Sequence, residues 1–407
     1  MGFRGHWTIG PFYVSPMTTA LARPPYFTVA DVDLGLLREL IAERTDPGRY
    51  PHAQAVVGEV VVYDMLELAP ILSEWSGRHA VMAELADVLS DGPGVLCLRH
   101  AVARDVLDRT TAAFERILAE QARSGGGVGD HFAAAGANGR VWNAVEKLAV
   151  GEPDVFVDYY AADAIALAAG AWLGPGYQVT SQLNVVRPGG AAQAPHRDFV
   201  LGFMSDAQAA VYPAHVHTMS PQLTLQGAIA HVDMPVASGP TKLLPHSQKL
   251  PDGYLAWRRP DVVELFEEHH VQLPLDAGDA VFFNPALFHA AGSNHTAAIH
   301  RMANLLQIVS PFGRAMESVD RARVVRALYP VLLGRAKAGA DRVALANVVA
   351  ASAEGYPFPT NLDRDPPIDG LAPPSQADLV WRALTEQWPV ARLDDALDHA
   401  AFRRWTT

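Results

Sequence analysis

A His-x-Asp pair, His196 and Asp198, is followed far downstream by a second histidine, His289. Two imidazoles and one carboxylate can occupy one face of an Fe(II) ion and leave three coordination positions open. Arg301 follows His289, and a guanidinium group can hold a carboxylate through two parallel hydrogen bonds. These residue types, in this order, indicate a non-heme iron centre that takes a carboxylate-bearing co-substrate and dioxygen in its open positions.

Short extended segments are needed to bring these side chains together. Residues i and i+2 of a strand point to the same face, so an extended His196-Arg197-Asp198 would project both metal-binding groups to one side. Downstream, Gly278-Asp279 is typical of a turn, residues 280–283 favour a strand, and His289 follows a bend. Arg301 lies 301 − 289 = 12 residues later, which is enough chain for a turn and a return to the same pocket.

The composition is that of an ordinary globular protein. Of the 407 residues, 49% are hydrophobic and 19% are charged, and the formal net charge of −12 argues against nucleic acid as the main partner. The single cysteine, Cys97, excludes an intrachain disulfide and a cysteine-based zinc site. We therefore expect a cytoplasmic protein with no secretory signal and no membrane span, acting on a small molecule. The sequence leaves the oligomeric state open.

The periodicity of the hydrophobic residues places strands in the middle of the chain and helices at both ends. Candidate strands are 55–63, 178–187, 198–204, 222–231, 240–244, 270–274, 279–283 and 301–310, and candidate helices cover 64–90 with a break near Gly77, 101–123, 155–173, 317–352, 375–387 and 393–405. This spacing of strands favours a mainly β core of the jelly-roll type. We expect an N-terminal helical extension at 1–90, the core at 91–310 and a C-terminal helical extension at 311–407. The glycine-rich stretch 124–129 is expected to form a surface loop.

Four motifs in the expected order resemble the phytanoyl-CoA dioxygenase family. They are the stretch from Gln182 to Asp198 with Gln193-x-x-His196-x-Asp198, the segment Gly239-Pro240-Thr241 with Pro245-His246-Ser247, the turn Gly278-Asp279 leading to His289, and Asn294 with Arg301. The resemblance covers roughly residues 90–310. It implies a double-stranded β-helix core, also called a cupin-like jelly roll.

The resemblance also implies cofactors and residue roles. Fe(II), 2-oxoglutarate and dioxygen would react with the substrate, and succinate and carbon dioxide would be released. His196, Asp198 and His289 would be the iron ligands, and Arg301 would bind the distal carboxylate of 2-oxoglutarate. Gln182 and Asn184 are similar to family positions that bond the co-substrate or line the site. A carboxylate at position 198, where related halogenases have a small residue, favours hydroxylation, desaturation or ring chemistry.

Two departures from the family pattern matter. The usual Pro-Gly-Ser-His is Pro245-His246-Ser247-Gln248 here, so the turn is altered. Many relatives carry a Ser or Thr two residues after the distal histidine, where it also bonds 2-oxoglutarate. This chain has Ala291 there, so either Ser293 or Thr296 substitutes, or no hydroxyl does.

Other interpretations of single residues remain beside this one. His295 and His300 compete with His289 for the distal ligand position, and His215-Val-His217 resembles a cupin His-x-His but is expected to lie in a loop. The aromatic residues Trp142, Tyr159, Tyr160 and Phe199 fit either a pocket wall or the core. A basic stretch is either a solvated helix face or a grip for an anionic substrate, such as the phosphate of a CoA or carrier protein; it contains Arg321, Arg323, Arg326, Arg335 and Lys337.

The competing function is a jelly-roll protein that binds a metal or small molecule without turnover. Arg301 discriminates between the two, because a metal-binding site alone has no need of a second group that grips a carboxylate. His-Arg-Asp also occurs in the kinase catalytic loop, but no glycine-rich phosphate loop, strand lysine or Asp-Phe-Gly accompanies it. A kinase is therefore excluded.

Overall fold

The computed structural model describes residues 24–124 and 138–406. Its larger sheet contains β1 (Ala55–Val57), β2 (Val60–Asp64), β3 (Val95–Arg99), β4 (Asn138–Val141), β5 (Gln178–Val186), β6 (Thr224–Ala230), β9 (Ala280–Phe283) and β11 (Arg301–Val309). These eight strands lie in the order β1-β2-β3-β9-β6-β11-β5-β4, and all neighbours are antiparallel except β2 and β3. A smaller sheet pairs β10 (His289–Ala290), β7 (Lys242–Leu243) and β8 (Val271–Gln272) in that order.

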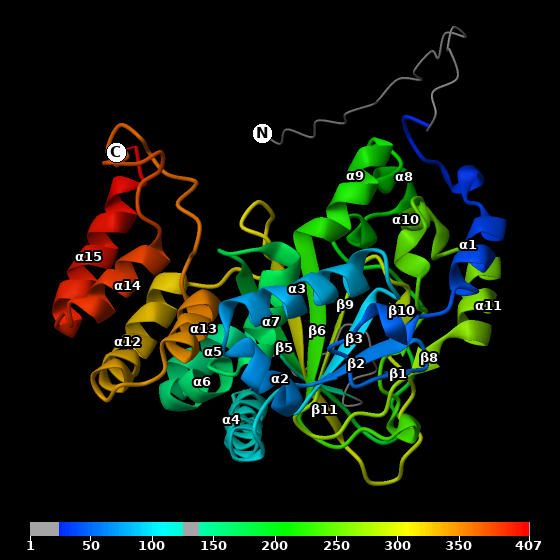
Figure 1. Cartoon of the computed structure of the whole chain (residues 1–407), viewed down its shortest axis with the longest axis horizontal. Coiled ribbons are helices and arrows are strands. Elements are labelled where there is room, and N and C mark those ends of the chain that lie inside the picture. The colour runs from blue at the N-terminus through cyan, green and yellow to red at the C-terminus, as the bar shows by residue number, and fades with distance from the viewer. Residues whose placement is uncertain (1–23, 125–137, 407) are drawn as a thin grey trace, which may run out of the picture.

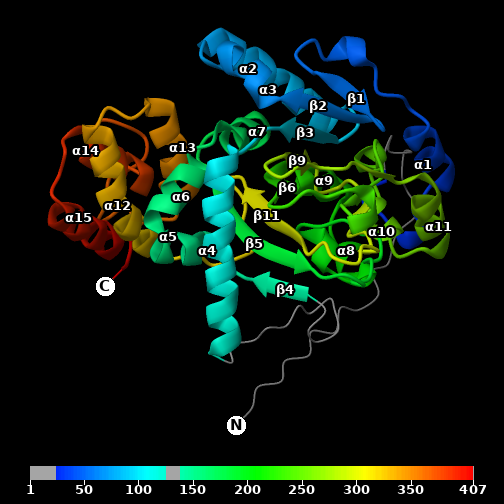
Figure 2. The ribbon, with the colours of Figure 1, turned by 90° about the horizontal axis from the view of Figure 1, so that it is seen from below.

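The helices lie around this core (Figures 1 and 2). They are α1 (Leu34–Ile41), α2 (Met65–Leu72), α3 (Trp75–Ser90), α4 (Arg104–Arg123), α5 (Ala144–Gly151), α6 (Pro153–Tyr160), α7 (Asp163–Leu173), α8 (Asp206–Ala209), α9 (Ala214–Met219), α10 (Gly253–Ala256), α11 (Pro260–His269), α12 (Arg321–Lys337), α13 (Arg342–Ser352), α14 (Gln376–Thr385) and α15 (Val390–Arg403). Helices α2, α3, α5, α7 and α13 contact the larger sheet, and α12, α14 and α15 pack together at one end of the molecule.

Alternation along the strands separates two hydrophobic layers. On β3, Leu96 and Leu98 belong to the large cluster shared with the helices, whereas Val95 and Cys97 belong to a smaller cluster inside the protein. On β9, Phe282 faces the helices, and its neighbours along the strand face the interior. Successive side chains of a strand point to opposite faces, so one face of the sheet is covered by helices and the other is left to build a pocket.

The expected sheet core is present, but helices hold far more of the described residues than a mainly β chain would have. The helices that the sequence analysis did not expect include α5 at 144–151 and the short helices α8, α9, α10 and α11, which flank the strands between residues 206 and 269. Segment 124–129 lies outside the described residues except for Ser124. The strand expected at 198–204 is wrong: this segment is irregular and contains a short 3-10 helix, Leu201–Phe203.

Two further expectations about element boundaries are wrong. Residues 55–63 form a hairpin rather than one strand, because Gly58 and Glu59 both adopt positive φ (56° and 70°), as a tight hairpin turn requires. Residues 155–173 contain parts of two helices, α6 and α7, rather than one helix. The expected break in 64–90 is present, between α2 and α3, a few residues ahead of Gly77.

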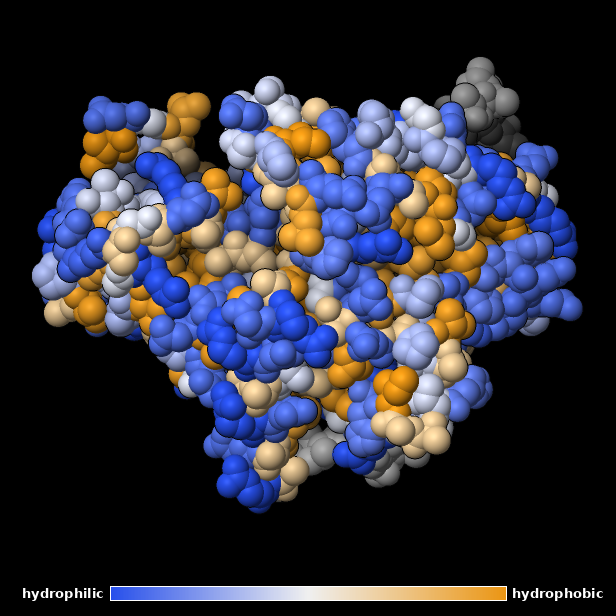
Figure 3. Space-filling model, turned by 60° about the horizontal axis from the view of Figure 1, so that its bottom comes forward, coloured by the Kyte–Doolittle hydropathy of each residue, from blue (hydrophilic) through white to orange (hydrophobic). Residues whose placement is uncertain are grey.

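The surface mixes polar and apolar residues. In Figure 3, hydrophilic residues cover most of the visible face, and hydrophobic residues appear between them in smaller patches. Scattered exposed hydrophobic residues are normal for a folded protein. Within the described ranges, no helix is both long enough and apolar enough to cross a membrane.

Candidate metal centre

A short antiparallel bridge places His196 directly opposite His289. The backbone N–H of His196 donates to the His289 oxygen at 2.9 Å, and the reverse bond measures 3.1 Å. Two residues that exchange both bonds project their side chains to the same side. The imidazole centroids are accordingly 4.4 Å apart. Asp198, two residues beyond His196, lies on that side as well, and its N–H donates to the oxygen of Pro285 at 3.2 Å.

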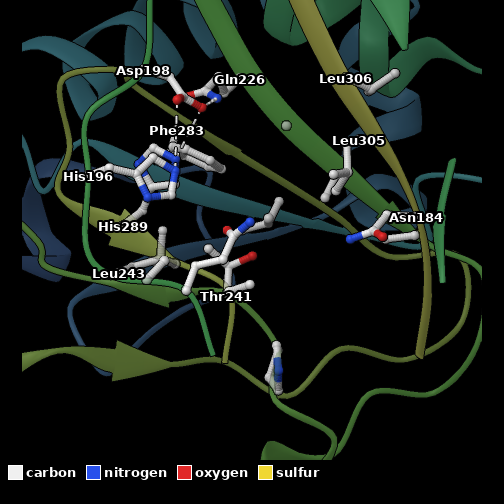
Figure 4. A pocket seen from close by; sticks show the side chains of 18 of the residues that line it. Asn184, His196, Asp198, Gln226, Thr241, Leu243, Phe283, His289, Leu305 and Leu306 are labelled. Carbon is white, nitrogen blue, oxygen red and sulfur yellow. Dashed lines mark hydrogen bonds and ion pairs between the residues drawn. The ribbon is translucent and has the colours of Figure 1, made fainter. Parts of the chain in front are cut away.

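The three side chains converge on one point. One ligand atom from each of His196, Asp198 and His289 lies within 4.8 Å of the others. The carboxylate oxygens of Asp198 are 3.8 Å from Nε2 of His196 and 3.5 Å from Nε2 of His289. Figure 4 shows the two rings side by side below the carboxylate.

Hydrogen bonds set which ring nitrogens face the centre. Nδ1 of His196 is 2.9 Å from the Ala194 oxygen, and Nδ1 of His289 is 2.9 Å from the Leu287 oxygen. A carbonyl oxygen only accepts, so Nδ1 of each ring carries the proton and Nε2 keeps a lone pair directed at the centre. Two neutral imidazoles and one carboxylate form the donor set that suits Fe(II), so these residues fit the metal expected from the sequence.

The local charges favour this protonation state. Burial lowers the pKa of His196, and His289 beside it lowers that pKa further. Burial alone would raise the pKa of Asp198, but His289 and His196, when protonated, and the amide of Gln226 lower it to about 2. The centre therefore offers an ionised carboxylate near neutral pH, as metal binding requires.

Arg301 is a buried cation in the same cavity. It opens β11, its exposed fraction is 7%, and burial lowers its pKa to about 10, so it stays charged near neutral pH. Its Nη1 donates to two carbonyl oxygens, that of Gly292 at 3.1 Å and that of Ser238 at 3.4 Å. Across the described part of the chain, no carboxylate forms an ion pair with it. A buried charge without an ionic partner is costly, so this position suits an anionic ligand.

The cavity has a volume of about 640 Å³ and is lined by the His196, Asp198 and His289 cluster and by Arg301, Gln182 and Asn184. This size is typical of small-molecule sites. Gln182 accepts a hydrogen bond from Arg140 at 2.9 Å, and Oδ1 of Asn184 is buried with no hydrogen-bond partner among the described residues. In Figure 4, Asn184 points into the cavity from the wall opposite the histidines.

Most of the alternative candidates for metal ligands and for the pocket wall lie outside the cavity. His295 and His300 are exposed and do not line the cavity. His217 lies in α9 rather than in the expected loop, and it contacts the Ala209 oxygen at 3.1 Å. Trp142 lines the cavity, whereas the other three aromatic candidates are buried outside it: Tyr159, Tyr160 and Phe199.

Neither expected substitute for a hydroxyl at position 291 reaches the cavity wall. The Ser293 hydroxyl accepts a bond from the Ala192 N–H, and the Thr296 hydroxyl donates to Asn294. Thr241, which the sequence analysis quoted only as part of a motif, does line the cavity (Figure 4).

Sequence reasoning also missed Gln226 and Phe283. Gln226 donates to Asp198 at 2.5 Å, and the Phe283 ring packs 4.8 Å from the ring of His289. Both residues lie on expected strands, at positions that alternate with core residues facing the helices. Because side chains alternate along a strand, this pattern could have predicted that Gln226 and Phe283 face the cavity.

More than half of the chain matches the family model described as Phytanoyl-CoA dioxygenase (PhyH), over residues 90–303. Among solved structures, the chain is similar to the non-heme alpha ketoglutarate dependent epimerase SnoN from nogalamycin biosynthesis (20% identity, 57% of this chain, 82% of that chain, TM-score 0.41). It is also similar to the carbocyclase SnoK from the same biosynthesis (20% identity, 56% and 83%, TM-score 0.41). A third is AviO1 from Streptomyces viridochromogenes Tue57 (19% identity, 55% and 92%, TM-score 0.38). No curated protein matches the chain.

Proposed function

The chain belongs to the phytanoyl-CoA dioxygenase family, and on that premise we propose that it oxidises a C–H bond of a small organic molecule. Iron and 2-oxoglutarate are its cofactors. For hydroxylation, substrate, 2-oxoglutarate and dioxygen give hydroxylated substrate, succinate and carbon dioxide, so one oxygen atom enters each organic product. When bound, the iron and 2-oxoglutarate supply this oxidising chemistry, and the protein supplies binding, orientation and shielding.

Different residues of the cavity would bind the metal and the co-substrate. His196, Asp198 and His289 would hold the metal, and Arg301 would grip the distal carboxylate of 2-oxoglutarate by paired hydrogen bonds. Thr241 would supply the hydroxyl that Ala291 lacks. The single observation that carries the proposal is the buried Arg301, charged and without an ionic partner, in the wall of the cavity that contains the metal-binding residues.

The basic stretch of α12 argues for a free small metabolite over a carrier-bound one. Arg323 pairs with Glu146, and Arg326 pairs with Asp394 and Asp398. Arg321 is partly buried and donates to two carbonyl oxygens, while Arg335 pairs with Asp158. These four arginines are thus bound within the chain rather than presented to an external phosphate.

We infer that the two sheets form the double-stranded β-helix of the family, because a carboxylate, two histidines and an arginine meet between them. The division into 1–90, 91–310 and 311–407 also stands as a proposal, with β1 and β2 of the first region extending the sheet of the second. The cytoplasmic location stays a prediction from the single cysteine, and hydroxylation is favoured by the carboxylate of Asp198.

The test is conversion of 2-oxoglutarate to succinate by the iron-loaded protein in air. With a metabolite that is its substrate, we expect succinate from the wild-type chain and none from Asp198→Ala. Candidate metabolites would then be ranked by the rate of succinate release that each one supports. Tight binding of iron and 2-oxoglutarate with no succinate under any condition would instead favour the non-catalytic binding protein.

A further inference from the structure

Gln226 contacts the carboxylate of Asp198 from the central part of the larger sheet. It lies on β6, and its Nε2 donates to Oδ2 of Asp198 at 2.5 Å (Figure 4). An ionised carboxylate only accepts hydrogen bonds, so the NH₂ group of the amide must face Asp198 and the amide oxygen must face away. The orientation of this side chain follows from chemistry alone.

This orientation of the Gln226 amide leaves its oxygen in an unfavourable environment. Oε1 of Gln226 is buried and has no hydrogen-bond partner among the described residues. A buried acceptor without a partner costs about 1–3 kcal/mol. A leucine at this position would fill the same space without the cost, so the contact with Asp198 is the feature that explains a glutamine here.

The backbone of Gln226 is held firmly. Its Cα is paired with that of Phe283 on β9 and that of Gln307 on β11, so the residue has a strand on each side. The carboxylate of Asp198, by contrast, turns about a terminal torsion that is intrinsically broad. A fixed donor on one oxygen is therefore an effective way to stop that rotation.

We propose that Gln226 is a positioning residue that fixes the rotation of the Asp198 carboxylate against the two imidazoles. Oδ2, which Gln226 holds, lies 3.5 Å from Nε2 of His289, and Oδ1 lies 3.8 Å from Nε2 of His196. Each oxygen thus lies near one imidazole, where the ligand atoms converge, and a carboxylate held in one orientation presents a fixed ligand to the metal. This inference rests on the proposed metal centre and adds a residue that controls its geometry.

The test compares metal affinity in Gln226→Met and Gln307→Met, using Co(II) as the probe. Methionine keeps the length of glutamine and removes its donor. Gln307 is the matched control, because it lines the same cavity and pairs with Gln226 across the sheet without contacting a metal-binding side chain. Loss of a group that orients a ligand typically weakens metal binding 10–100-fold. We therefore expect a Kd at least 10-fold higher for Gln226→Met in calorimetry and a changed visible spectrum of bound Co(II), with Gln307→Met within about threefold of wild type.

Equal Kd values for wild type and Gln226→Met would overturn the inference, as would equal weakening by both methionine variants. Where Gln226→Met does not fold, Gln226→Asn tests the same point, because its amide is one methylene too short to reach Asp198. Failure of the proposed function looks different. In that case Co(II) binding by the wild type would itself be absent, or would be unchanged in Asp198→Ala.

Discussion

Replacing Arg301 by methionine should separate function from stability. Burial lowers the pKa of Arg301 from 12.5 to about 10. This lowering means that keeping the guanidinium charged inside the protein costs about 3 kcal/mol. The two hydrogen bonds to Ser238 and Gly292 are long and contribute about 1 kcal/mol each. Because the Ser238 and Gly292 carbonyls also lose a donor, these effects nearly cancel, and removing the cation should change the free energy of unfolding of the ligand-free protein by no more than about 1 kcal/mol.

Arg197 provides a matched control, because it is equally buried and its pKa is likewise lowered to about 10. Both terminal nitrogens of its guanidinium, however, donate within the protein. It donates to Ser247 at 2.5 Å and to Leu250 at 3.0 Å, and it lies 4.6 Å from the centroid of the Phe288 ring. Arg197→Met gains the same relief from burying a charge, but it removes shorter hydrogen bonds and the packing against Phe288, so it should lower the stability by about 1–3 kcal/mol more than Arg301→Met does.

Urea unfolding of the ligand-free proteins measures both changes. The measurement is then repeated with metal and 2-oxoglutarate, since a ligand at 100 times its Kd stabilises the native state by about 2.7 kcal/mol. We expect 2-oxoglutarate to stabilise wild type and to lose this effect in Arg301→Met. If Arg301→Met were destabilised like Arg197→Met and were still stabilised by 2-oxoglutarate, Arg301 would be a structural residue and the reasoning would be refuted.

Three further predictions concern the metal, pH and packing. Asp198→Ala should abolish Fe(II) binding in equilibrium dialysis while the circular dichroism spectrum stays native, and retained binding would exclude Asp198 as a ligand. Burial lowers the pKa of His231 to about 3, so below its ordinary value of 6.5 only the unfolded chain gains the proton, and stability falls as pH falls. Between pH 7 and pH 5 this loss is about 2 kcal/mol. His231→Gln should remove it from urea titrations, and identical pH profiles would contradict the assignment. A Cβ on Gly227 would lie 2.6 Å from the Phe282 ring, so Gly227→Ala should cost about 1–3 kcal/mol, and an unchanged urea midpoint would show that the ring moves freely.

The three proposed metal ligands, His196, Asp198 and His289, could be predicted because each follows a local rule. His196 and Asp198 are two residues apart on an extended segment, and His289 follows a strand and a bend that the sequence marks with Gly278 and Pro285. The structure brings these three side chains together, and it places Arg301 at the start of β11. The alternation of side chains along a strand, the turn residues and the residue types were enough to predict that part of the site.

The errors arise where distant residues decide local structure. The apolar run after Asp198 favours a strand, yet the Ser220 hydroxyl accepts from the Val200 N–H and donates to the Phe199 oxygen, and Phe199 adopts a φ of 37°. Likewise, no glycine or proline marks the break between α6 and α7, where Asn347 donates to the Ala161 oxygen. Gln226 was missed because its partner, Asp198, is 28 residues away.

The most direct test of the metal centre and its co-substrate is anaerobic titration of the protein with Fe(II) and 2-oxoglutarate, followed by visible absorption. We predict the weak charge-transfer band of an iron-bound 2-oxoglutarate in wild type. The band should be absent in Asp198→Ala and should require far more 2-oxoglutarate in Arg301→Met. Iron binding without the band in wild type, or an unchanged 2-oxoglutarate requirement in Arg301→Met, would contradict the account.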